Sequence, residues 1–141
     1  MSASPVLSAD LVRDLDRQPG PEAWNRIRQT LLDLFSRDLP EDAVAESRKR
    51  DGLVAPLDLY LSTSAWDLWS GFGEWVPRTS HALKQWWQAN GSGKAILILD
   101  GFSLRELSWF VTHAAGHRLR VKGIQVLGAE FPADTVPFAK A

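Results

Sequence analysis

A short polar motif follows an apolar run in the second half of the sequence. Residues 95–99 are all apolar and lead directly into Asp100 and Gly101. A run of this length, rich in isoleucine and leucine, predicts a strand buried on both faces. Ligands of open α/β sheets bind beyond the carboxyl ends of such strands, so the Asp100 carboxylate is placed to meet a ligand. Alternatively, Asp100 only turns the chain into the next helix.

A second polar motif lies 35 positions further along, where Pro132 and Pro137 bracket Asp134 and Thr135. The two prolines exclude a regular helix or strand throughout this segment. We therefore predict a loop that presents a carboxylate and a hydroxyl. If the preceding strand runs parallel to the one that ends at Asp100, both polar motifs face one cleft.

The elements between the two motifs form a βαβ pattern. Ser103 and Glu106 have the spacing of a capping box and predict the start of a helix that runs to Gly116. A second strand is predicted at about residues 119–127. Strand, helix and strand within some thirty residues predict a parallel pair with a right-handed crossover.

The residues ILILDGFSLRE, followed at this interval by FPADTVPFA, resemble the start of the PglZ domain, a branch of the alkaline phosphatase superfamily. The resemblance covers residues 94–141 and implies a parallel, alkaline phosphatase-like sheet. It also implies that Asp100 is a metal ligand and Thr135 the nucleophile, with Asp134 and Arg105 as supporting residues. PglZ-type proteins are associated with bacterial phage defence of the BREX kind, and this context is implied by the same resemblance.

The implied activity is metal-dependent phosphoryl- or sulfuryl-transfer hydrolysis. A threonine hydroxyl is a poor nucleophile near neutral pH, and coordination to zinc or manganese is one way to activate it. Two metal ions about 4 Å apart can hold the attacking and the leaving oxygen. The superfamily places its other Asp and His ligands well downstream of the nucleophile, whereas this sequence stops six residues after Thr135. We therefore expect a truncated domain that is inactive and binds metal weakly by itself.

The three histidines all precede the Thr135 loop. His113 and His117 are four positions apart, so on a helix they would share one face and could bind a metal together. Gly116 favours the alternative, in which both imidazoles lie exposed at a helix end. His81 lies near a predicted helix start and carries no signal.

Residues 1–93 are predicted to be a mainly helical region that packs on the sheet of residues 94–141. The clearest helix covers residues 21–35, where apolar positions recur at steps of three and four. Residues 53–61 fit an edge strand and a helix almost equally well. The charge run at residues 46–51 is interpreted as a solvated helix end, with phosphate binding by its basic residues as the alternative.

Seven tryptophans permit three interpretations. Most are expected to fill the core and the space between helices. Trp66, Trp69 and Trp75 are candidates for an exposed patch that meets a protein partner. Stacking on nucleic-acid bases requires a basic groove as well, and the near balance of 16 basic and 17 acidic residues argues against it.

Composition excludes several classes of protein. The chain has no cysteine, so it forms neither a disulfide framework nor a thiolate metal site. It has no apolar run of membrane-spanning length and no secretory signal at its start, so a cytoplasmic location is expected. Two functions follow as expectations. One is the N-terminal part of a PglZ-type hydrolase that requires a missing C-terminal half, and the other is a non-catalytic interaction module with Trp-rich helices.

Overall fold

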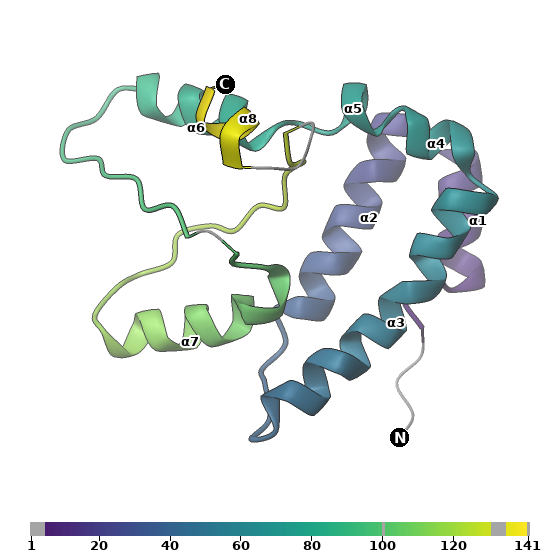
Figure 1. Ribbon diagram of the computed structural model, residues 1–141, viewed down its shortest axis with the longest axis horizontal. Helices are drawn as coiled ribbons and strands as arrows, with labels where there is room; N and C mark the ends of the chain where they lie inside the picture. Colours follow the sequence, from purple (N-terminus) through teal and green to yellow (C-terminus); the bar gives the residue numbers. More distant parts are fainter. Residues whose placement is uncertain (1–4, 100, 131–134, 141) are drawn as a thin grey trace.

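The computed structural model describes residues 5–99 and 101–130, and the backbone of residues 135–140 with some of its side chains. Within this part of the chain the regular elements are helices (Figure 1). In chain order they are α1 (Ala9–Arg17), α2 (Gly20–Phe35), α3 (Ala43–Thr63), α4 (Trp66–Ser70), α5 (Phe72–Trp75), α6 (Thr79–Gln88), the 3₁₀ helix η1 (Leu104–Glu106), α7 (Leu107–Gly116) and α8 (Thr135–Lys140).

Helices α1 and α2 begin where local chemistry favours a helix start. The Ser8 side chain accepts a hydrogen bond from the backbone N–H of Leu11 at 3.1 Å and so caps α1. Pro21 lies in the first turn of α2, where its fixed φ suits a helix and its missing N–H costs nothing. The helix predicted over residues 21–35 is confirmed, because α2 spans it completely.

Helix α3 resolves the ambiguous segment at residues 53–61 in favour of a helix. Asp42 caps its start through the backbone N–H of Ala45 at 3.0 Å. Leu57 and Leu61 lie four positions apart and are both buried, as the helical period requires. The helix continues through Pro56, which removes one internal hydrogen bond. The edge-strand interpretation of this segment is wrong.

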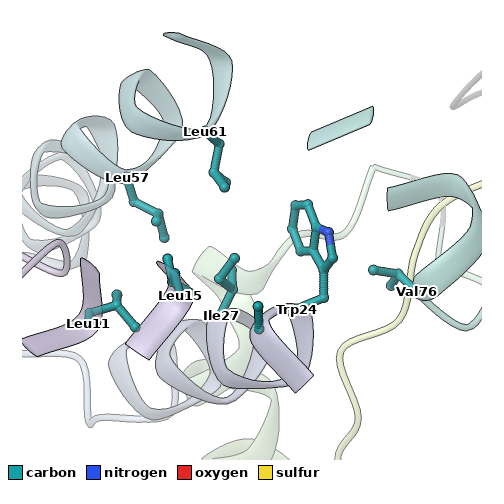
Figure 2. Packing of buried hydrophobic residues seen from close by; sticks show 8 residues of the cluster. Leu11, Leu15, Trp24, Ile27, Leu57, Leu61 and Val76 are labelled. Carbon is teal, nitrogen blue, oxygen red and sulfur yellow. The ribbon is translucent and has the colours of Figure 1, made fainter. Parts of the chain in front are cut away.

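One hydrophobic cluster joins α1, α2 and α3 and closes on the residue that follows α5. Figure 2 shows these side chains converging between the helices. The cluster lies between positions 11 and 76, so the first half of the chain supplies it. Its buried members are Leu11, Leu15, Ala23, Trp24, Ile27, Leu57, Leu61 and Val76.

The predicted parallel sheet and βαβ unit are wrong, because the described residues contain no strand. Residues 94–99 and 119–127 form no ladder with each other. An apolar run becomes a buried strand only if neighbouring strands and a covering layer enclose it. Here Leu97 is 76% exposed, and the helices pack on one another instead of on a sheet. The helical first half predicted with that sheet is present as α1–α6.

Helix α7 confirms the segment predicted between Ser103 and Gly116, with η1 as its first turn. Its end is a Schellman motif: the N–H of Leu119 donates to the Ala114 carbonyl at 3.0 Å, and the N–H of Arg118 donates to Ala115 at 3.2 Å. Arg118 has φ 61°, in the left-handed region where glycine is usual.

A few polar contacts attach the second half of the chain to the first. Gly128 forms an isolated parallel β-bridge with Arg78, in which its N–H donates to the Pro77 carbonyl at 2.9 Å. The Arg28 guanidinium of α2 donates to the Val126 carbonyl at 3.0 Å. The Glu130 carboxylate accepts from the backbone N–H of Ser80 at 3.1 Å and so caps α6. In Figure 1, α6 and α8 lie on the opposite side of α2 from α1, while the start of α7 lies toward α3, and long loops connect α6, α7 and α8.

Candidate functional site

The residues of the predicted hydrolase site are only partly within the described structure. Asp100 and Asp134 lie outside the described residues, as does the side chain of Thr135. By its backbone, Thr135 begins α8. The two parallel strands expected to bring Asp100 and Thr135 to one edge are absent from the described residues, so that route to a common cleft is removed.

Arg105 binds Asp51. Its Nε lies 3.0 Å from both carboxylate oxygens, and the contact joins η1 to α3. Both side chains are roughly half exposed. The Arg105–Asp51 pair lies between two grooves of about 470 and 450 Å³. Residues of α3 and η1 line both grooves. The contact therefore positions the start of α7 against the helical core.

The capping box predicted from Ser103 and Glu106 is confirmed. The Ser103 hydroxyl accepts from the backbone N–H of Arg105 at 3.2 Å, and the Glu106 carboxylate accepts from the Ser103 N–H at 2.9 Å. Hydrogen bonds from the Ser103 hydroxyl and backbone lower the pKa of Glu106. This carboxylate is therefore engaged in capping the start of the helix.

One basic residue of the charge run, Arg50, is engaged inside the protein. Arg50 is 2% exposed, and its guanidinium donates to the carbonyls of Arg37 at 3.1 Å and Asp38 at 2.9 Å. Its Nε lies 3.0 Å from the Glu46 carboxylate, and this hydrogen bond lowers the Glu46 pKa. The guanidinium also lies 3.5 Å from the carbonyl of Phe35, the last residue of α2, so Arg50 caps the end of α2 and holds the segment after it from inside the protein.

The two spaced histidines lie at the end of α7. The His113 ring stacks on Trp109 with centroids 4.2 Å apart, and its Nδ1 lies 2.8 Å from the Trp109 carbonyl. His117 is the C-cap residue. The described residues contain no group of three or more His, Cys, Asp or Glu side chains arranged to hold a metal ion.

The three tryptophans of the predicted patch have different environments. Trp66 is 61% exposed and Trp69 is 42% exposed. Trp75 is half-buried and packs against the core, where its ring lies against Gly20 and Gly71. Two of the three side chains are therefore available to a partner, while the third is mainly structural.

Sequence reasoning missed a larger group of exposed apolar side chains. Of sixteen large hydrophobic residues exposed in the described part of the chain, eleven lie between positions 86 and 121. We call these eleven the 86–121 apolar set. The seven tryptophans were a signal for it, since five of them are exposed and three of those five belong to the set. Its members are Trp86, Trp87, Ile96, Leu97, Ile98, Leu99, Phe102, Trp109, Phe110, Leu119 and Val121.

Local packing organises part of this set. Trp87, Ile96 and Ile98 line a groove of about 390 Å³ between α6, the following segment and α8. Phe102 and Phe110 meet edge to face with ring centroids 5.6 Å apart. The Lys94 ammonium lies 5.3 Å from the centre of the Trp86 ring and donates to the Trp86 carbonyl at 2.8 Å, so it also caps α6.

Charge divides the chain into two unlike halves. Residues 1–77 contain 8 Lys and Arg against 13 Asp and Glu, whereas residues 78–141 contain 8 against 4. The net charge of the whole chain is near zero because an acidic first half is balanced by a basic second half. The 86–121 apolar set lies in the basic half.

Among the described helices, none combines the length and the apolar character that a bilayer crossing requires. Comparison with protein-family models, with curated proteins and with solved structures gave no match to this chain.

Proposed function

We propose that this chain is a protein-interaction module. Helices α1 to α5 and Val76 form a packed scaffold, and the 86–121 apolar set is the surface that a protein partner covers. The observation that carries the proposal is the concentration of exposed large apolar side chains in one half of the chain.

Physical reasoning favours a covered surface. Removing apolar surface from water contributes about 25 cal/mol per Å² to the free energy of association. Covering the eleven exposed apolar side chains would therefore stabilise a complex substantially. Large exposed apolar patches on proteins commonly mark interaction sites. Tryptophan and phenylalanine are also enriched at protein interfaces, and tryptophan is among the residues that contribute most of the binding energy there.

The experiment compares two matched double variants in the cell that naturally makes the protein. L97S/I98S removes two of the most exposed members of the set, and V44S/L59S makes the same kind of change at two exposed positions of α3. We expect the wild type and V44S/L59S to elute in one complex of fixed stoichiometry and L97S/I98S to elute as the free chain. Equal elution of all three proteins would contradict the proposal.

The PglZ resemblance supports a second proposal, in which the chain contributes to a metal-dependent hydrolase with Asp100 as ligand and Thr135 as nucleophile. Its support is the residue pattern, together with the helix that Ser103 caps three positions after Asp100. In a longer form of the protein that hydrolyses a phosphodiester with zinc or manganese, Asp100→Ala and Thr135→Ala should each abolish turnover. Unchanged turnover in either variant would refute this proposal.

A further inference from the structure

Residues 118–122, with the sequence RLRVK, alternate basic and apolar side chains. All five are exposed, and from residue 119 to 127 the chain forms neither helix nor strand. In an extended backbone the side chains of alternate residues lie on the same side. Arg120 and Lys122 then lie on one side of the chain and Leu119 and Val121 on the other. Arg118, which ends α7 in the left-handed conformation, adds a third cation immediately before them. We call Arg118, Arg120 and Lys122 the basic row.

The backbone of this segment is open to pairing. Within the described residues, the N–H groups of residues 120–127 donate to no acceptor, and of their carbonyls only that of Val126 accepts a bond, from Arg28. Unpaired backbone groups in a row are a template for another strand. The segment already ends in a parallel β-bridge between Arg78 and Gly128, which fixes one end of it in strand geometry.

The charges of the basic row also have no partner among the described residues. The side chains of Arg118, Arg120 and Lys122 form no ion pair or hydrogen bond with any described residue. Two other cations of this half are occupied: Lys94 caps α6, and Arg105 binds Asp51. A ligand that carries negative charges at alternate positions would neutralise the row without displacing an internal contact.

We propose that residues 120–126, with Arg118 beside them, bind an extended acidic segment of a protein partner by strand addition. The inference rests on the proposed function and specifies the chemistry of the partner. Main-chain hydrogen bonds would give affinity, and pairs of carboxylates with the basic row would give specificity. A peptide is favoured over single-stranded nucleic acid because the row alternates with aliphatic side chains, which bury against protein, while nucleic-acid sites interleave cations with aromatic stacking platforms.

The first test uses fluorescence anisotropy with the purified chain and a labelled, end-blocked peptide of four Glu-Val repeats. A Lys-Val peptide of equal length is the charge control. We expect saturable binding of the Glu-Val peptide that weakens as salt rises, because surface charge pairs are screened. Equal binding of both peptides would overturn the inference. Stronger binding of an oligothymidylate of about 20 nucleotides would assign the segment to nucleic acid instead.

Two variants separate the basic row from net charge. R118E/R120E/K122E should weaken binding of the Glu-Val peptide by about tenfold, since each exposed charge pair contributes little by itself and all three are lost. The same variant should gain binding of the Lys-Val peptide. R17E/R37E/R48E changes net charge equally at exposed arginines of the first half and should bind like the wild type. Equal loss in both variants would overturn the inference.

A third measurement tests the backbone. A Glu-Val peptide that is N-methylated at alternate residues retains its charges but loses the N–H groups of one edge, so it should bind much more weakly when that edge faces the segment. Peptides methylated on either register are compared, and undiminished binding of both would exclude strand addition. If the peptides fail while L97S/I98S still releases the chain from its complex, this inference falls and the proposed function stands.

Discussion

The guanidinium of Arg105 lies with its Nε 3.0 Å from both carboxylate oxygens of Asp51, so η1 is joined to α3 across 54 positions of sequence. The pair lies on the surface between two grooves. It is one of the few specific polar contacts between the packed first half of the chain and the second half that carries the apolar set.

A double-mutant cycle of Asp51→Ala and Arg105→Ala should give a coupling free energy of about 0.5 kcal/mol in low salt, since both partners are partly exposed. Urea unfolding measures it. The coupling should fall toward zero in about 1 M salt, where the screening length is about 3 Å. A coupling unaffected by salt would contradict the assignment of this contact as a surface ion pair.

Gly71 should not tolerate a methyl group, because its β-carbon would overlap the ring of Trp75. Its φ of −76° suits any residue, so Gly71→Ala tests the steric contact without backbone strain. We expect a loss of about 1–3 kcal/mol in the free energy of unfolding. Gly52→Ala is the matched control: it lies inside α3 with open space around it and should stabilise by about 0.5–1 kcal/mol.

Tyr60 reports on the contact between α3 and α1. Burial, together with a 2.7 Å hydrogen bond to Asp16, raises the pKa of Tyr60 to about 12. Because the folded pKa is above the unfolded value of about 10, the stabilisation is complete below pH 10 and is lost as pH rises through 12. Tyr60 is the only tyrosine, so absorbance at alkaline pH follows it directly. Titration near pH 10 in the folded protein would contradict the contact, and Asp16→Asn should lower the pKa.

Arg118→Gly should stabilise the end of α7. Arg118 occupies the left-handed position of the Schellman motif, where a side chain costs about 1 kcal/mol relative to glycine. Hydrogen exchange of the Leu119 amide, which donates to Ala114, measures the effect. Arg118→Ala is the control, since it removes the charge but retains a β-carbon. Equal protection in both variants would show that charge, and not backbone conformation, decides stability there.

Sequence periodicity predicted α2 and the capped start of α7 because both depend on residues within one or two turns. The strands at residues 94–99 and 119–127 were wrong because an apolar run does not specify its partners, and burial depends on them. Leu57 and Leu61 show the same limit. Their spacing fits a helix, but their burial depends on contacts with α1 and α2 that the local sequence does not specify. The tryptophan pattern could not separate Trp75, which packs against two glycines, from the exposed Trp66. The roles assigned to Asp100 and Asp134 stay predictions, because both residues lie outside the described structure.

Site-specific photo-crosslinking from Leu97, in the cell that makes the protein, tests the interaction module most directly. Leu59 is the control, because it is 63% exposed and lies outside the 86–121 apolar set, while Leu97 is 76% exposed. We predict one adduct of defined mass from position 97, shared with position 109 and absent from position 59. Identical weak labelling from positions 97, 109 and 59 would contradict the claim that a protein partner covers this surface.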